Sequence, residues 1–537
     1  MAIPSFSSET EQVMGPLIAE MPRRAEQRAP QGVALGSLPT SDDVKRTTWF
    51  IFLLLVVLLL AIFVVAIPAD HLLLDPDLYW HTATGRLIWT TWSLPRVDEF
   101  SHTFRGDPWI ARDWLSDLAF YGSYSLDGWR GVSILAALSI ALAYGLLFLM
   151  LARTIRLTVA IGVAVVMVFL SFSHLHARTQ LLADGLIVVW VAALVRAVDT
   201  KTSPSWWLLP AMALWANVHG GFIVGLALAA GLAAEAIIEG PSGERRSLAR
   251  RWTVFLLAAV AASCLTPYGW GPLLLTFKGF VLGNEVKQYV REWQPVSLMS
   301  APITLIFVLL MMFAALLAGA KIRLPRLVLV IALTGIMLSS VRYVGPYNLV
   351  TPLLLATPLC AQFPILRFTS QIESQPQFFV LLAKAARRTL YPLYAAIVLI
   401  PFAAAAFGKA VTPDPQITPA AAVDYIVDHN DGGKVYNSFN FGGYLIFRKV
   451  PTFVDGRTDQ LFLNGFFSQR INTTTKHPRK IIQYLEEYNI KFVLVEPDSF
   501  ESQELQATVG WRKVYSDKYS VLFEKGAVGQ PGQDGRE

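Results

Sequence analysis

The chain has 537 residues, of which 54% are hydrophobic and 16% are charged, and its formal net charge is +6. Soluble domains carry about a quarter charged residues, so this composition excludes an ordinary soluble protein. The basic residues fall mainly in short connections on one side of the apolar segments. We therefore attribute the positive charge to membrane topology and expect no nucleic-acid partner.

The first apolar segment is Thr48–Pro68, which contains no charged residue. A helix needs about 20 apolar residues to cross a bilayer. A cleavable signal peptide is the alternative, but a long polar segment precedes this block and no A-x-A cleavage site follows it. We therefore predict a membrane anchor. Residues 1–47 mix Pro, Gly, Ser and charges without periodicity, which predicts a disordered cytoplasmic tail.

Similar blocks follow along the chain and predict about 11 membrane-spanning helices within residues 48–410. The further blocks lie at about 131–152, 157–173, 181–198, 206–219, 221–239, 252–267, 300–320, 326–341, 345–363 and 389–408. Lys and Arg gather in every second connection, which places the N-terminus in the cytoplasm. An odd number of spans then places the C-terminal residues outside, on a protein of the inner (cytoplasmic) membrane.

Two long loops are predicted to face outward. The first, residues 69–130, holds nine acidic residues, five arginines and six tryptophans. An aromatic belt at the membrane surface explains the tryptophans but leaves the acidic excess unexplained. The second, residues 268–299, is typical of an interfacial amphipathic helix that is interrupted by Pro and Gly.

Residues 411–525 read as alternating β and α elements, so the predicted fold class is an α-helical polytopic membrane protein with a small C-terminal α/β domain outside the cytoplasm. The expected helices are Ala420–His429 and Pro478–Tyr488. The expected strands are Lys434–Asn437, Tyr444–Phe447, Thr452–Asp455, Lys491–Val495 and a closing hairpin of Trp511–Tyr515 and Ser520–Phe523. Residues 526–537 are predicted to form a flexible tail.

Asp75, Asp77 and His81 follow the first span directly. Pro76 fits the first position of a helix with Asp75 as its cap, which places Asp77 and His81 on one face. Such a group can hold a divalent cation or remove a proton from an acceptor hydroxyl. The alternative is that Asp75 only caps the helix and Asp77 only favours its dipole. The spacing leaves both interpretations open.

A second polar cluster in the same loop runs from Arg105 to Trp114. Arginine suits a phosphate and tryptophan suits stacking on a sugar, whereas a turn with ordinary surface ion pairs is the alternative. Other polar residues lie at the predicted outer ends of spans. They are His174, His176 and Arg178, with Asp184 one turn into the next span, then His219, and Arg342 with Tyr343. Ionisable residues near lipid usually face a cavity or a partner, although an Asp184–Arg178 ion pair is a structural alternative.

These motifs together resemble bacterial members of the GT-C superfamily of polyprenyl-phosphate-sugar-dependent glycosyltransferases. The resemblance covers about residues 48–525 and rests on the segments DPDLYWHTATGRLI, PRVDEFSHTFRGDPWIARDWLSDLAFY, HARTQLL, WANVHGGF, LTPYGW, REWQP, VRYVGPYNL, NFGGYLIFR and FVDGRTD. It implies an inverting transfer of a sugar from a lipid phosphate at the outer membrane surface. By that likeness a carboxylate of the Asp75/Asp77 pair is the base, and arginines neutralise the leaving phosphate.

We therefore expect Asp77 and Asp75 to be catalytic. The expected substrate-binding residues are His81, Arg105, Asp113, Trp114, His176, Arg178, His219 and Arg342. A divalent metal ion on the Asp75/Asp77 pair is left open. No nucleotide cofactor is expected, because no G-x-G-x-x-G follows a strand and no P-loop occurs. The expected partners are a polyprenyl-phosphate sugar donor, membrane lipids, and a glycan, lipid or protein acceptor.

Three other classes remain as alternatives. A ligase or polymerase of envelope polysaccharides would normally place its large outer loop late in the chain, whereas here that loop comes first. A transporter should show broken helices and charges near the midplane of the membrane. A non-enzymatic envelope-assembly protein would use the outer domain as its binding module.

The charge pattern makes the orientation testable. A topology reporter fused after Gly526 should be active only outside the cytoplasm, whereas one inserted between Gly240 and Arg251 should report the cytoplasm. The opposite result at either position would contradict the predicted outer location of the acidic loop.

Overall fold

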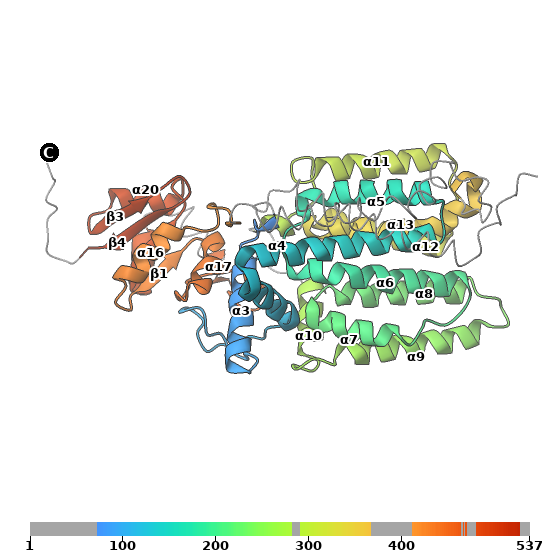
Figure 1. Ribbon diagram of the computed structural model, residues 1–537, viewed down its shortest axis with the longest axis horizontal. Coiled ribbons are helices and arrows are strands. Elements are labelled where there is room, and N and C mark those ends of the chain that lie inside the picture. Colours follow the sequence, from blue (N-terminus) through green and yellow to red (C-terminus); the bar gives the residue numbers. More distant parts are fainter. Residues whose placement is uncertain are drawn as a thin grey trace, which may run out of the picture. The chain divides into compact units, whose positions relative to one another are not determined.

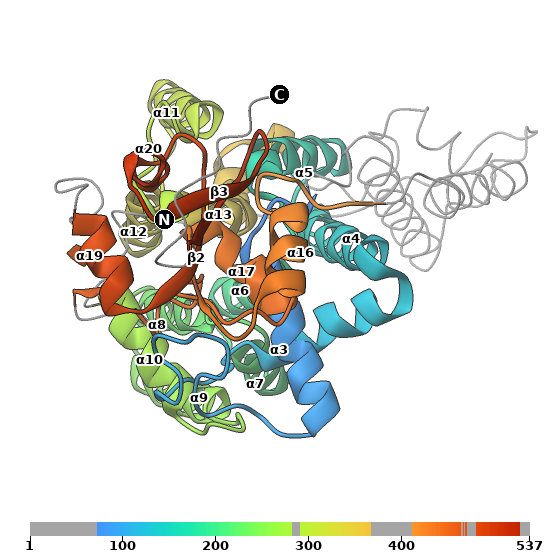
Figure 2. The same cartoon turned by 90° about the vertical axis from the view of Figure 1, so that its left-hand side faces the viewer.

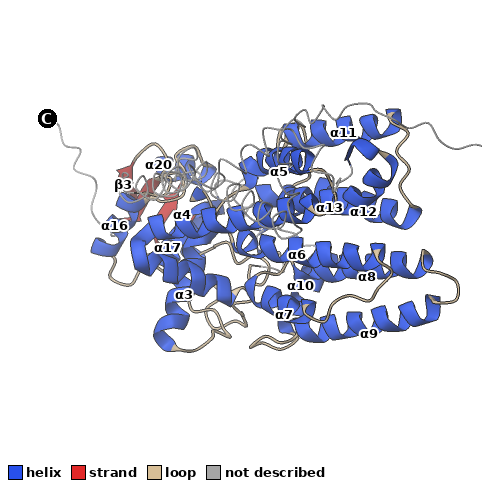
Figure 3. Cartoon of the chain, turned by 45° about the vertical axis from the view of Figure 1, so that its right-hand side comes forward, coloured by secondary structure: helices blue, strands red, loops and turns tan. Residues whose placement is uncertain are grey.

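The computed structural model describes residues 72–281, 290–366, 411–462, 465–466, 468–469 and 480–526. The predicted spans at 48–68 and 389–408 lie outside the described residues, as do the predicted tail at 1–47 and residues 527–537. The number of 11 spans is therefore not confirmed. Figure 3 shows that helices dominate the described chain and that strands are confined to its C-terminal region.

A bundle of helices follows the first loop (Figure 1). Its helices are α4 (Trp114–Ala152), α5 (Leu157–Ser171), α6 (Thr179–Asp199), α7 (Leu208–Val218), α8 (Phe222–Ile238), α9 (Arg245–Ser263), α11 (Pro302–Leu317), α12 (Leu324–Ser339) and α13 (Val344–Gln362). Among the described residues four helical segments are long and apolar enough to cross a membrane, namely Trp114–Ala152, Leu157–His174, Thr179–Asp199 and Val341–Gln362. Large apolar side chains such as Phe313, Leu316 and Ile331 are exposed on the outside of the bundle, as expected where lipid is the solvent. The chain is a membrane protein.

The two ends of the bundle carry different ionic groups. In the first turn of α12, the buried Arg326 pairs with Glu235 at 2.6 Å and with Asp199 at 3.4 Å. Arg342 lies just after the C-terminal end of α12. Arg178 lies just before the N-terminal end of α6, whose C-terminal residue is Asp199. Arg178 and Arg342 therefore lie at the end of the bundle opposite to Arg326.

The first loop is largely helical. It contains α3 (Asp77–Thr91) and the first part of α4, which is separated from the apolar part by non-helical backbone at Asp127 and Gly128. Helix α3 packs closely on α4 at Gly85. A Cβ atom at this position would overlap the carbonyl oxygen of Asp117, so only glycine permits this approach. In the second loop, the described elements are the helix α10 (Gly271–Val281) and the short 3₁₀ turn η3 (Arg291–Trp293).

The C-terminal α/β region, residues 411–526, contains a four-stranded sheet (Figure 2). Its elements are α16 (Ala420–His429), β1 (Lys434–Asn437), α17 (Phe439–Phe447), α19 (Lys480–Glu487), β2 (Ile490–Val495), α20 (Phe500–Ala507), β3 (Trp511–Ser516) and β4 (Val521–Lys525). The strand order is β1-β2-β4-β3, with β1 and β2 parallel and the other pairs antiparallel. The predicted helix at Ala420–His429, the first two strands of this sheet and the closing hairpin are confirmed.

Two predicted strands are wrong. Residues Tyr444–Phe447 belong to α17, because the continuous apolar run does not alternate and its helical form buries Leu445 and Ile446 in the core. Residues Thr452–Asp455 form no strand, and Thr452 makes only an isolated parallel bridge with Ser101 of the first loop.

The first loop and the C-terminal α/β region share their hydrophobic core. Ile88 and Trp109 of the loop are buried in one cluster with Phe453 and Leu485. In a second cluster, the fully buried Tyr79 of α3 packs edge-on against Tyr444, with ring centroids 5.2 Å apart. The two regions, far apart in the sequence, therefore form one continuous structure.

Gly443 allows α17 to approach α3, because a Cβ atom there would overlap the carbonyl oxygen of Pro76. We expect Gly443→Ala to lower the free energy of unfolding by about 1–3 kcal/mol, since a backbone carbonyl cannot move aside freely. Gly243→Ala is the matched control, because a Cβ there meets nothing within 4 Å. Equal unfolding temperatures for the two variants in detergent would contradict the close packing of α17 on α3.

Candidate active site

Helix α3 begins at Asp77 with Pro76 as its N-cap residue, one residue later than predicted, and Asp75 lies just before it and is buried. One carboxylate oxygen accepts the backbone N–H of Asp77 at 2.9 Å, as expected for a residue that initiates a helix. Its second oxygen forms an ion pair with Arg178 Nε. Both oxygens of Asp75 are therefore engaged by protein donors.

Asp77 is surrounded by protein atoms, and the residue as a whole is half-buried. Its Oδ1 atom accepts a hydrogen bond of 3.0 Å from Trp80 Nε1. Burial, reinforced by the negative charge of Glu292, raises the pKa of Asp77 to about 7, although His81 and Arg342 act in the opposite direction. A carboxylate with this pKa can accept a proton efficiently near neutral pH.

His81 lies one turn further along α3, beneath the indole ring of Trp80, with ring centroids 3.6 Å apart. Its Nδ1 atom contacts Asp117 Oδ1 at 2.5 Å. Burial opposes protonation of the imidazole, but the Asp117 carboxylate outweighs burial and raises the pKa of His81. The pair connects α3 to α4 next to Asp77.

Asp113 and Arg112 precede α4 and form a closed ionic group. Arg112 contacts Asp113 at 3.1 Å and Asp459 of the C-terminal α/β region at 2.8 Å. Asp113 also accepts a hydrogen bond of 3.1 Å from Thr179 Oγ1. Burial alone would favour the neutral acid, but Arg112 holds the pKa of Asp113 well below its ordinary value. Asp113 is therefore a permanent negative charge that is matched by its neighbours.

His219 lies in the turn between α7 and α8. Its Nδ1 atom accepts the backbone N–H of Gly221 at 3.0 Å. Burial lowers the pKa of His219 to about 3, and the arginines Arg342 and Arg112 act in the same direction, whereas Asp113 opposes them. The imidazole is therefore neutral, and its Nε2 atom carries the proton.

Glu292, from η3, joins two arginines at the same end of the bundle. It forms an ion pair with Arg178, and a longer one of 3.9 Å with Arg342. The guanidinium carbon of Arg342 lies 4.9 Å from the centroid of the Trp293 ring. Arg178 is held by two carboxylates, those of Asp75 and Glu292. Among the described residues, the one ion-pair partner of Arg342 is the distant Glu292 carboxylate, and its side chain is partly exposed, so it can accept an anionic ligand.

The structure brings most of the predicted site residues into this one cluster. They are Asp75, Asp77, His81, Asp113, Arg178, His219 and Arg342. Trp114 lies at its edge, where its Nε1 atom donates to Asn217 Oδ1 at 2.7 Å. Arg105 is exposed at the tip of the first loop. His176 contacts the carbonyl oxygen of Ser173 at 3.1 Å within its own turn.

The alternative of an Asp184–Arg178 ion pair is not what forms. Arg178 turns toward Asp75 and Glu292, and Asp184 is buried within α6. The sequence reasoning also missed Glu292 as a site residue. It lies in the REWQP segment, and no local pattern indicates that this loop folds back onto α3.

The described residues do not present a set of metal ligands. Among them, no group of three or more His, Cys, Asp or Glu side chains is placed to hold a metal ion. Each carboxylate oxygen of Asp75 already has a protein partner, and Asp77 Oδ1 accepts the hydrogen bond from Trp80. These donors do not fit a chelate on the Asp75/Asp77 pair, and the use of a divalent ion stays a prediction.

Comparisons with known proteins give matches at the level of structure. No protein-family model and no curated protein matches the sequence. The crystal structure of ArnT from Cupriavidus metallidurans bound to undecaprenyl phosphate is similar with a TM-score of 0.50 and 15% identity, over 91% of this chain and 100% of that one. The archaeal oligosaccharyltransferase AglB from Archaeoglobus fulgidus, in complex with an inhibitory peptide and a dolichol-phosphate, has a TM-score of 0.50 and 11% identity, over 91% of this chain and 75% of that one. At these identities the similarity establishes the fold.

Proposed function

Starting from the GT-C glycosyltransferase fold that the chain has, as its motifs predicted, we propose that it transfers a sugar from a polyprenyl-phosphate donor to an acceptor hydroxyl. The reaction takes place on the outer face of the cytoplasmic membrane, with the N-terminus in the cytoplasm. The observation that carries the proposal is the position of Asp77. Its carboxylate has a pKa of about 7 and lies in one cluster with the weakly paired Arg342.

Asp77 and Arg342 have distinct roles in the proposed transfer. Asp77 removes the proton of the acceptor hydroxyl as that oxygen attacks the anomeric carbon of the donor. The bond between this carbon and the phosphate oxygen breaks, and the lipid phosphate leaves with the electron pair. Arg342 neutralises the negative charge that develops on the phosphate. Attack from the side opposite to the leaving group inverts the anomeric configuration.

Two observations support a lipid-phosphate donor. The similar structures of ArnT and AglB were obtained with undecaprenyl phosphate and with a dolichol-phosphate, respectively. In this chain, Arg342 lies next to the end of a bundle helix, where a phosphate at the membrane surface can reach it while the lipid chain stays in lipid. The acceptor is a glycan, a lipid or a protein.

The polar cluster also argues against a transporter. Its members come from the ends of helices and from the loops between them, whereas a transporter binds its substrate near the midplane. The continuous α6 and α12 helices that lead to this cluster are not broken within the bundle.

The first test of the proposal is Asp77→Asn, which removes the base but keeps the shape. We expect a loss of about 10²–10⁴-fold in transfer at unchanged folding. Wild-type transfer should rise with pH through about 7, since Asp77 acts only when ionised. The control is Asp107→Asn in the same loop, where the side chain is exposed. Near wild-type transfer by Asp77→Asn would overturn the assignment.

Asp75→Asn should mainly lower stability, because Asp75 initiates α3 and pairs with Arg178.

The second test concerns the donor. Arg342→Ala should raise KM for the polyprenyl-phosphate sugar, and Arg342→Lys should restore it poorly, because lysine keeps the charge but loses the planar fork. Arg250→Ala, at an exposed position of α9, is the control. Normal donor binding by Arg342→Ala, measured by titration in detergent, would mean that Arg342 has only a structural function.

A further inference from the structure

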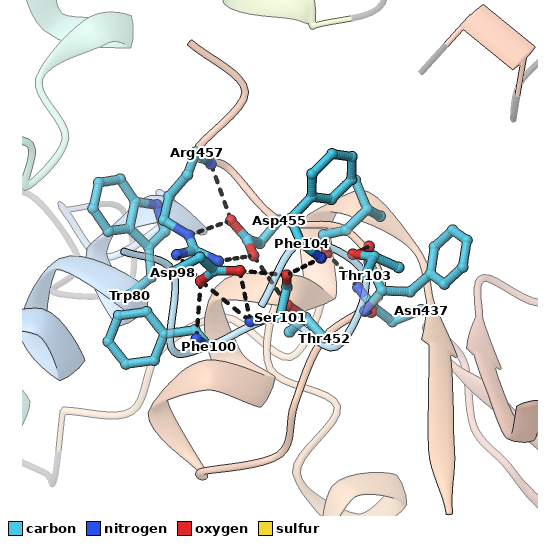
Figure 4. A network of polar contacts seen from close by, with 12 residues as sticks. Trp80, Asp98, Phe100, Ser101, Thr103, Phe104, Asn437, Thr452, Asp455 and Arg457 are labelled. Carbon is cyan, nitrogen blue, oxygen red and sulfur yellow. Dashed lines mark hydrogen bonds and ion pairs between the residues drawn. The ribbon is translucent and has the colours of Figure 1, made fainter. Parts of the chain in front are cut away.

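A buried arginine joins the first loop to the C-terminal α/β region. Arg457 is 0% exposed and donates to Asp455 through Nε and Nη2, both at 2.8 Å, and to Asp98 of the first loop through Nη1 at 2.5 Å. Its guanidinium carbon lies 5.2 Å from the ring centroid of Phe100 and 5.0 Å from that of Trp109. Figure 4 shows the side chain of Arg457 facing both carboxylates.

The two carboxylates are themselves fixed by other donors. Asp455 accepts hydrogen bonds from Thr452 Oγ1 at 2.9 Å and from the backbone N–H of Arg457 at 3.1 Å. Asp98 accepts the backbone N–H of Phe100 at 2.9 Å and pairs with the hydroxyl of Ser101. A buried charge network in which every member has partners holds its backbone segments in one arrangement.

Gly456, between Asp455 and Arg457, packs directly against Asp77, the proposed base. A Cβ atom at Gly456 would overlap Asp77 Oδ1 and would lie 2.9 Å from Trp80 Nε1. The backbone of Gly456 therefore packs against the hydrogen bond that orients the Asp77 carboxylate. At the end of the same turn, Asp459 pairs with Arg112 at 2.8 Å.

We propose that the turn Asp455–Asp459 is a wall of the catalytic site and that Gly456 and Arg457 are positioning residues for Asp77. The C-terminal α/β region is then part of the catalytic unit, and not a separate binding module. The catalytic role of Asp77 rests on the proposed function, whereas the contact between Gly456 and Asp77 is a feature of the structure itself.

The charged groups that face Asp77 lie outside the turn Asp455–Asp459. They are His81 on α3, Glu292 on η3 and Arg342 after α12. A displacement of the wall leaves these groups in place and changes mainly the burial of Asp77. Because burial is the largest cause of its raised pKa, displacement should move the pKa of Asp77 back toward its ordinary value.

The variant Gly456→Ala tests the wall in the full chain. We expect kcat to fall about 10²-fold through misplacement of the base, with KM for the donor unchanged. The midpoint of the pH profile should shift to lower pH. The matched control is Gly122→Ala in α4, where a Cβ meets nothing within 4 Å. A wild-type kcat and pH profile in Gly456→Ala would overturn the inference.

A double-mutant cycle tests the contact without any transfer assay. Gly456→Ala should lower the thermal unfolding temperature in the wild-type background, and most of this loss should disappear in the Asp77→Ala background, because the overlapping carboxylate is then absent. If Gly456→Ala alone fails to fold, recovery of folding in the double variant supports the contact. The same loss in both backgrounds, or no recovery, overturns it. Absence of transfer by the wild type would refute the proposed function, and the cycle would still decide whether the wall positions Asp77.

Discussion

The buried guanidinium of Arg457, held between Asp98 and Asp455, is the interaction on which the first loop and the C-terminal α/β region depend. A charge that is removed from water must be matched by partners with good geometry, because one missing partner leaves an uncompensated buried ion. Here one partner, Asp98, lies 359 positions before Arg457 in the sequence. The same network therefore determines how the first loop, α3 and the C-terminal α/β region fit together around Asp77.

The polar cluster around Asp77 contains two kinds of charged groups, those whose charge is matched by a protein partner and those that are poorly paired. Asp113 and Arg112 are mutually compensated, and the oxygens of Asp75 are engaged by α3 and Arg178. Asp77, by contrast, has a pKa near neutrality, and the one ion-pair partner of Arg342 among the described residues is the distant Glu292 carboxylate. A base and a cation that keep unused capacity are what a glycosyl transfer from a lipid phosphate requires.

Local patterns in the sequence predicted the elements that local forces determine. Helix Ala420–His429 and the closing hairpin follow from periodicity and turn residues, and the acidic start of α3 follows from its Asp-Pro-Asp segment. The helix at Tyr444–Phe447 was missed, because a continuous apolar run fits a buried strand as well as a helix. The approach of Glu292 and Gly456 to Asp77 could not be predicted, since only the tertiary fold brings these loops together.

The central claim is that Asp77 and Arg342 form one site for a lipid-phosphate sugar beneath the C-terminal α/β region. The most direct measurement is a cryo-EM structure of the full chain with bound polyprenyl phosphate. The account predicts phosphate density in contact with Arg342, on the side of the cluster that Asp77 faces. Phosphate density at another ordered position, such as the Arg326 end of the bundle, with Arg342 still paired to Glu292, would contradict it.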